Sequence, residues 1–153
     1  MKNVLRAIAR LFLPALVFCA TAASIAASQT WKADNGNGTF SNPLFYDEFS
    51  DPDLIRVGDD YYLTGTTMHT MPGLPVLHSR DLVNWEFMSY ALDKLDLGPE
   101  YRLEGGKEIY GKGIWAPSFR YYKGTFHIFS NVNGQTTQHF TATQPEGTVD
   151  ARR

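Results

Sequence analysis

The chain has 153 residues, which is room for one domain or for part of a larger one. Hydrophobic residues make up 43% and aromatic residues 14%, so the composition supports a packed core and excludes a chain that is disordered throughout. The formal net charge of −2 offers no basic surface to a nucleic-acid backbone. The single cysteine excludes both an internal disulfide and a cysteine-based zinc site.

The first segment, residues 1–28, has the pattern of a secretory signal peptide. Lys2, Arg6 and Arg10 form a basic start. The apolar run over residues 11–20 is shorter than the roughly 20 residues that a membrane-spanning helix needs. Small residues end the segment, as a signal peptidase requires. The sequence therefore predicts a secreted or periplasmic protein that leaves the membrane after cleavage, and a membrane-anchored helix is the alternative.

Residues 29–40 are polar and rich in Gly and Asn, which predicts a flexible leader. Beyond them, short runs rich in β-branched and aromatic residues alternate with turns, and no long helical period appears. Residues 92–110 are rich in Gly and charge and are expected to form a long loop. The sequence predicts an all-β fold of hairpins, with paired runs at 54–57 and 61–64, 76–79 and 84–88, and 119–122 and 125–129.

An internal repeat is visible in the hairpin region. The run Pro52–Arg56 resembles Pro117–Arg120 with one residue fewer, and from Arg56 and Arg120 onward the offset is 64. Repeated antiparallel units of this size are typical of the blades of a β-propeller. A coincidence between two ordinary hairpins is the alternative, because the same turn chemistry recurs in any β protein.

Three blocks in this order resemble glycoside hydrolase family 43: residues 42–45 with 50–63, residues 72–85, and residues 113–117. The resemblance covers about Ser41 to Gly147. It implies a five-bladed β-propeller, of which residues 41–153 would form about two blades. It also implies inverting hydrolysis of the O-glycosyl bonds of xylo- or arabino-oligosaccharides, as in β-xylosidases and α-L-arabinofuranosidases, with an oligosaccharide or plant polysaccharide as substrate.

Asp51 matches the general base of that family. Pro52 is expected to hold Asp51 in an extended backbone, at the mouth of the innermost strand where the blades converge. An inverting glycosidase needs a carboxylate there to activate water. An ordinary Asp-Pro turn is the alternative. Asp53 is expected on the same side of the strand as Asp51, because side chains two residues apart share a face.

The family resemblance also supplies candidate sugar-binding residues. Trp115 matches a tryptophan that lines the sugar pocket, where a flat ring can cover sugar C–H bonds; a tryptophan in the blade core is the alternative. Met68 and His69 lie in a loop that borders the pocket in this family. Trp85 is expected to pack in the blade. The four histidines show no metal-ligand spacing, so no metal or cofactor is expected, and no ligands are identifiable for the Ca²⁺ at the hub of some relatives.

In the family the general-acid Glu comes from a later blade. Glu100, Glu104 and Glu108 stand too early in the order to replace it. After Gly147 the tail Thr148–Arg153 departs from the family pattern, which predicts a frameshifted or truncated gene product that is inactive alone. Two blades of five would also expose a blade face and strand edges. Two further interpretations stay open: a non-catalytic carbohydrate-binding propeller fragment, and a propeller with a structural or adhesive role.

Overall fold

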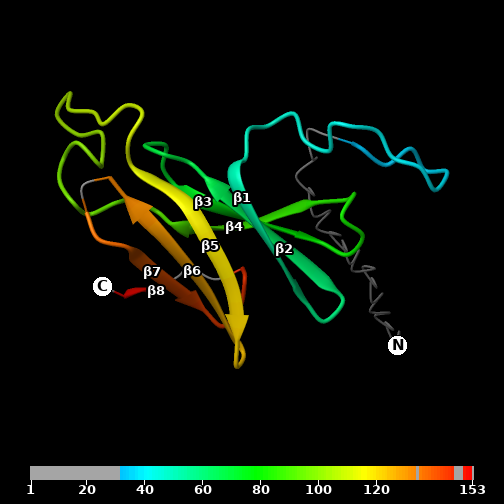
Figure 1. Ribbon diagram of the computed structural model, residues 1–153. Helices are drawn as coiled ribbons and strands as arrows, with labels where there is room; N and C mark the ends of the chain where they lie inside the picture. The colour runs from blue at the N-terminus through cyan, green and yellow to red at the C-terminus, as the bar shows by residue number, and fades with distance from the viewer. Residues whose placement is uncertain (1–31, 134, 147–149, 153) are drawn as a thin grey trace, which may run out of the picture.

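The computed structural model describes residues 32–133, 135–146 and 150–152 (Figure 1). Regular structure in these residues is entirely β, as the sequence predicts. No helix occurs among them, and hence none of the length and hydropathy needed to cross a membrane. The expected signal peptide, residues 1–28, lies outside the described residues, as does Gly147.

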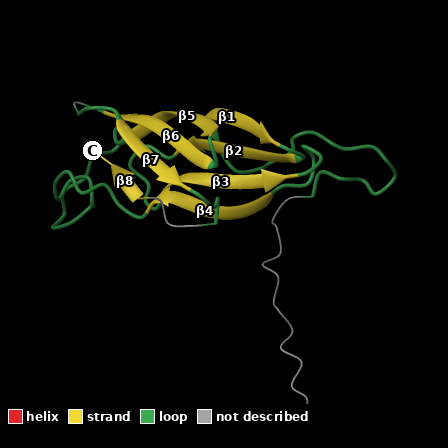
Figure 2. Ribbon diagram, turned by 90° about the horizontal axis from the view of Figure 1, so that it is seen from below, coloured by secondary structure: helices red, strands yellow, loops and turns green. Residues whose placement is uncertain are grey.

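Eight strands form two antiparallel sheets of four, and in each sheet the strands pair in their order along the chain. Blade one consists of β1 (Ser50–Val57), β2 (Asp60–Thr66), β3 (Gly73–Ser79) and β4 (Glu86–Leu92). Blade two consists of β5 (Ile114–Tyr122), β6 (Thr125–Val132), β7 (Gln138–Ala142) and β8 (Asp150–Arg152). In Figure 2 the two sheets run in the same order, from β1 and β5 at one edge to β4 and β8 at the other.

The first hairpins of the two blades repeat with an offset of 65 residues. Val57 pairs with Asp60 in blade one, and Tyr122 pairs with Thr125 in blade two. The offset of 64 predicted from the sequence is wrong by one, so the two arginines that the sequence comparison aligned lie one position apart. The repeat itself is confirmed, because each copy continues through four paired strands.

The first strand of each blade carries a bulge at its proline. Asp51 and Pro52 lie opposite one residue of β2, and Ala116 and Pro117 lie opposite one residue of β6. The residue before each proline has a positive φ, 47° at Asp51 and 53° at Ala116. The expectation of an extended Asp51 is therefore wrong, because the bulge absorbs its extra residue in a left-handed conformation. The bulge also breaks the expected alternation between Asp51 and Asp53.

The two blades pack against each other through a continuous apolar core. β3 and β4 supply its buried members from blade one, β5, β6 and β7 supply those from blade two, and the loop between the blades adds Leu95 and Tyr101. Each fully buried aliphatic or aromatic side chain contributes roughly 1.5–3 kcal/mol. The core therefore fixes how the inner strands β1 and β5 lie against each other. Its buried members include Leu74, Val76, Ala91, Phe119, Ile128 and Phe140.

A second apolar cluster covers the side of blade one that is turned away from blade two, which we name the far face of blade one. Leu63, Leu77 and Trp85 are buried there beneath Phe45 and Phe49. The ring of Phe45 lies 6.0 Å from that of Trp85 and 5.0 Å from that of Phe49. The segment that precedes β1 thus closes this face of the sheet.

Two loop regions complete the described structure. Residues 32–40 of the expected leader, together with Ser41, form a small bridged loop in which the Ser41 N–H donates to the Ala33 carbonyl at 2.9 Å and Ala33 is buried. Residues 93–113 form the long loop that the sequence predicts, with turns but no strand. Tyr101 anchors this loop, because its ring is buried and its hydroxyl donates to the Asn133 carbonyl at 3.2 Å.

Candidate active site

The carboxylate of Asp51 lies at the end of the sheets where β1 begins and β2 ends. The Thr66 hydroxyl donates to Asp51 Oδ2 at 3.1 Å and accepts a hydrogen bond from the Ala116 N–H at 2.8 Å. A single hydroxyl thus joins the carboxylate of blade one to the β5 backbone of blade two, one residue from Trp115. The Asp51 side chain is exposed, so water and ligands can reach it.

Trp115 and Trp85 occupy opposite environments. Trp115 is 40% exposed, and its carbonyl accepts a hydrogen bond from the Ser130 hydroxyl at 2.8 Å, which fixes the backbone beneath the indole. Trp85 is 2% exposed, and its Nε1–H donates to the Leu82 carbonyl at 3.0 Å. The predicted packing role of Trp85 is confirmed. The indole of Trp115 is available to a ligand.

The loop after β2 is joined directly to the start of β5. Met68 and Ile114 exchange two backbone hydrogen bonds of 3.0 and 2.9 Å. The contact requires glycine at 113, because a Cβ there would lie 2.1 Å from the Met68 carbonyl oxygen. Met68 itself has a φ of 55°. The bridge therefore places Met68 and His69 at the same end of the sheets as Trp115.

His69 borders a polar hollow of about 340 Å³. Its Nδ1 is buried and makes no hydrogen bond to the described residues. Leaving such an atom unpaired costs about 1–3 kcal/mol. Hydroxyl groups dominate the remaining wall, and the full lining is Glu48, Ser50, Thr66, Thr67, Met68, His69 and Thr70.

Sequence reasoning missed Thr66 and Glu48. Thr66 is the hydroxyl that links Asp51 to blade two, and Glu48 lines the hollow while it accepts a hydrogen bond from the Ser50 hydroxyl at 3.0 Å. The run of hydroxyl residues at the end of β2, residues 64–67, was the available signal for Thr66. Nothing local marks Glu48, because its place at the hollow depends on the bulge that follows it.

Asp53, unlike Asp51, bonds directly to residues of blade two. Its Oδ2 accepts hydrogen bonds from the Phe119 N–H and from an Arg120 guanidinium N–H, both at 2.7 Å. The carboxylate therefore ties β1 to β5 at the hub. This contact between the blades occupies Oδ2 of Asp53.

Two of the three glutamates named in the long loop, Glu104 and Glu108, are held by contacts within that loop. Glu104 forms an ion pair with Arg102 at 2.9 Å, which holds the pKa of Glu104 below its ordinary value. Glu108 accepts a hydrogen bond from the Tyr110 N–H at 2.7 Å. Among the described residues no group of three or more His, Cys, Asp or Glu side chains could hold a metal ion.

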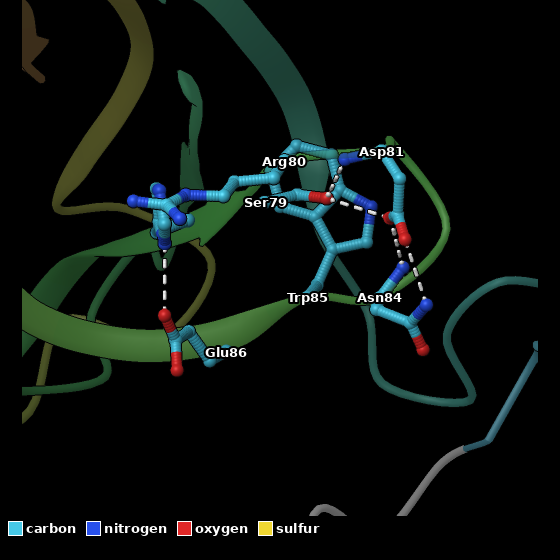
Figure 3. Close-up of a pocket in the computed structure, with 7 residues that line it drawn as sticks. Ser79, Arg80, Asp81, Asn84, Trp85 and Glu86 are labelled. Carbon is cyan, nitrogen blue, oxygen red and sulfur yellow. Dashed lines mark hydrogen bonds and ion pairs between the residues drawn. The ribbon is translucent and has the colours of Figure 1, made fainter. Parts of the chain in front are cut away.

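A second, larger hollow of about 410 Å³ lies at the loop between β3 and β4 (Figure 3). The polar residues that line it bond to one another. Asp81 accepts hydrogen bonds from the side chain and backbone of Asn84, which lower the pKa of Asp81 to about 2. Glu86 binds His78 Nδ1 at 2.8 Å. Trp85 beneath them is buried. This hollow offers no exposed ring and shares no lining residue with the hollow at His69.

The sequence pattern of glycosyl hydrolases family 43 matches residues 40–151. The chain therefore belongs to glycosyl hydrolases family 43. Its fold is that of two blades of the five-bladed β-propeller that its structural relatives share.

Individual relatives support the same assignment. The chain is 41% identical over 113 residues to a non-reducing end α-L-arabinofuranosidase of Bacteroides ovatus, and 37% identical over 110 residues to a β-xylosidase of Formosa agariphila. These matches cover 71% and 69% of this chain but 21% and 18% of the relatives, so the chain spans about a fifth of their length. A bifunctional enzyme of Bacteroides eggerthii is similar in structure, with a TM-score of 0.66 and 38% identity over 72% of this chain and 14% of its own.

Proposed function

We propose that this chain supplies the general base and the first sugar-binding surface of a glycosidase that acts on xylo- or arabino-oligosaccharides. The observation that carries the proposal is the Asp51–Thr66–Ala116 connection, which joins an exposed carboxylate to the backbone next to Trp115, a residue that is 40% exposed. The β-xylosidase and α-L-arabinofuranosidase names of its relatives agree with a pentose substrate.

The chemistry follows from the free oxygen of the carboxylate. The Thr66 hydroxyl donates to Asp51 Oδ2 and leaves Oδ1 to take a proton from a water molecule. The water oxygen forms a bond to the anomeric carbon while the bond from that carbon to the leaving oxygen breaks, so the configuration inverts. Trp115 holds the sugar in place by covering its C–H face.

The leaving oxygen needs a proton from a second carboxyl group, about 6.5–9.5 Å from the base across the sugar. Of the three loop glutamates, Glu104 and Glu108 are each held within their own loop, and Glu100, like them, stands too early in the chain to match the family's general acid. General acid assistance is worth about 10²–10⁴-fold in rate. We therefore expect the chain alone to bind sugar without turning over glycosides, which makes non-catalytic carbohydrate binding the second candidate function.

One pair of measurements tests both candidates. Calorimetric titration with xylo- and arabino-oligosaccharides should show binding that Trp115→Ala abolishes and that Asp51→Asn retains. Nitrophenyl xylosides and arabinofuranosides should be hydrolysed no faster by the chain than by its Asp51→Asn variant. Turnover that Asp51→Asn removes would confirm the base and refute the expected inactivity. Wild-type chain that binds neither sugar series would refute the proposal.

A further inference from the structure

The loop before blade one holds an asparagine and a glycine, Asn35 and Gly36, in an arrangement that the proposed hydrolysis does not use. Both residues are exposed, and the loop over residues 32–41 projects away from the two sheets (Figure 1). An asparagine followed by glycine can lose ammonia, because the glycine nitrogen can attack the side-chain amide carbon with no side chain of its own in the way. The attack is assisted by a base at the N–H and a donor at the amide oxygen.

The loop supplies a base at the attacking nitrogen. The Gly36 N–H donates to Asp34 Oδ1 at 2.7 Å, and Asp34 Oδ2 accepts a hydrogen bond from the Asn84 side chain at 3.0 Å. The hydrogen bonds from Asn84 and Gly36 lower the pKa of Asp34, so its carboxylate is ionised at neutral pH. The carboxylate therefore already contacts the proton that must leave when the Gly36 nitrogen forms a new bond.

The loop also supplies a donor at the oxygen of the reacting amide. The Ser41 hydroxyl donates to Asn35 Oδ1 at 3.1 Å, and the Asn35 Nδ2–H donates to Thr39 Oγ1 at 3.0 Å. A donor at Oδ1 stabilises the negative charge that collects on this oxygen as the nitrogen attacks. Asn35 thus has both kinds of assistance within its own loop.

A second dipeptide of the same type, Asn37 and Gly38, follows directly and serves as an internal comparison. Asn37 Oδ1 accepts hydrogen bonds from the Thr39 N–H at 3.1 Å and from the Thr39 hydroxyl at 2.6 Å, so its amide oxygen has donors as well. The Gly38 N–H makes no hydrogen bond to the described residues. The two dipeptides therefore differ in the base at the glycine nitrogen.

We propose that Asn35 is a site of self-catalysed deamidation, with Asp34 as the base and the Ser41 hydroxyl as the donor to the amide oxygen. The Gly36 nitrogen forms a bond to Asn35 Cγ, and its proton passes through Asp34 to the departing Nδ2. The bond from Cγ to Nδ2 breaks, and ammonia leaves. Water then opens the cyclic imide to aspartate or isoaspartate with no change in oxidation state, so each event adds one negative charge to the loop.

Peptide mapping of the full chain by mass spectrometry tests the proposal. Cleavage after Lys32 and Arg56 releases both dipeptides in one peptide, and its fragmentation assigns the mass gain and the isoaspartate to either asparagine. Asn35 should convert about 10-fold faster than Asn37, which is less than the roughly 10²–10⁴-fold of general acid–base catalysis because water competes at an exposed loop. Asp34→Ala should lower the rate at Asn35 to that at Asn37 and leave Asn37 unchanged.

Two further measurements isolate the base. Asn84→Ala is the matched control, because it removes the other hydrogen bond of Asp34 and keeps the one to Gly36, so the rate at Asn35 should not change. Between pH 6 and pH 8 the rate at Asn35 should also stay nearly constant, because the assisting carboxylate is ionised throughout. The rate at Asn37 should rise with the hydroxide concentration over the same range.

The outcomes decide whether Asp34 assists the reaction or protects against it. A faster reaction at Asn35 in Asp34→Ala would show that the hydrogen bond to Gly36 protects the dipeptide, and would overturn the proposal. Equal rates at Asn35 and Asn37 in the wild-type chain, or equal pH profiles, would also overturn it. Circular dichroism should show that each variant folds, and where Asp34→Ala does not, the two pH profiles of the wild-type chain give the decision.

Discussion

Blade one and blade two have the same arrangement of four strands, but the far face of blade one is covered by apolar side chains and that of blade two is open. On blade one, Phe45 and Phe49 cover the far face and bury Trp85. The far face of blade two, the side turned away from blade one, carries Phe129 at 39% exposure together with His127. In the described residues no apolar segment covers this face of blade two as Phe45 and Phe49 cover that of blade one.

Equivalent strand positions of the two blades carry side chains with different surroundings. Position 64 in blade one is a threonine buried against blade two, whereas the equivalent position in blade two is Phe129 on the open face. His139 stacks on Phe129 at 4.2 Å between ring centres, and its Nε2 lies 3.0 Å from His127 Nδ1. The pairing of the four strands is thus the same in both blades although different side chains cover their far faces. The candidate active site, by contrast, depends on residues of both blades.

The largest loss of stability is expected from a substitution in the apolar cluster on the far face of blade one. Trp85→Ala should lower the free energy of unfolding by about 3–5 kcal/mol, because it removes a buried ring and leaves a cavity beneath Phe45. Phe129→Ala in blade two should cost about 1 kcal/mol, since this ring is partly exposed and loses mainly its stacking on His139. Urea unfolding followed by circular dichroism measures both values.

Equal losses at the two positions would contradict the comparison. They would mean that Phe129 is covered in solution as thoroughly as Trp85. A sedimentation experiment on the same samples then identifies whether a second copy of the chain provides the cover.

A smaller effect concerns the contact between the blades. Asp53 and Ser118 occupy equivalent positions, but the Asp53 carboxylate accepts two hydrogen bonds from blade two. Asp53→Ala should cost about 2 kcal/mol, because it leaves the Phe119 N–H and the Arg120 guanidinium without this acceptor. Ser118→Ala is the matched control and should cost about 0.5 kcal/mol or less. A loss at Asp53 no larger than that at Ser118 would show that the carboxylate does not hold the blades together.

The sequence predicted the hairpins because their signals are local. Turn residues such as Gly58 and Gly124 supply a positive φ between runs of β-branched and aromatic residues, and both turns occur as expected. The repeat was found for the same reason, since each copy carries its own turn. The packing of Trp85 was also predicted, from its expected place in the outer strand over residues 84–88, although β4 begins one residue later at Glu86.

The remaining features depend on contacts between distant residues. The left-handed conformation of Asp51 contradicts the preference that Pro52 imposes locally, and it becomes clear only when β1 is paired with β2. The Thr66 link to Ala116 joins residues 50 positions apart, and that of Asp53 to Phe119 joins residues 66 apart. Such contacts leave no pattern in a single sequence.

The smallest expected effect is a pH-dependent contribution of His78 in blade one to the stability of the fold. His78 in blade one binds Asp60 at 2.7 Å and Glu86 at 2.8 Å, whereas the equivalent position of blade two is Thr141, which carries no titrating group. Burial of the imidazole acts to lower the pKa of His78, but the hydrogen bonds to Asp60 and Glu86 outweigh it, so the pKa of His78 is raised above 6.5. The folded chain therefore binds this proton more tightly than the unfolded chain does.

A raised pKa in the folded state stabilises the fold fully below the unfolded value of 6.5, and the contribution disappears as the pH rises through the folded value. His78→Thr, which copies blade two, should consequently reduce the urea midpoint at pH 6 and change it much less at pH 9. Thr141→Val is the control, because it alters the equivalent strand position without a titrating group. A difference between His78→Thr and the wild-type chain that stays constant from pH 6 to pH 9 would show that the charged imidazole contributes nothing, and that its packing alone distinguishes this strand of blade one from its counterpart.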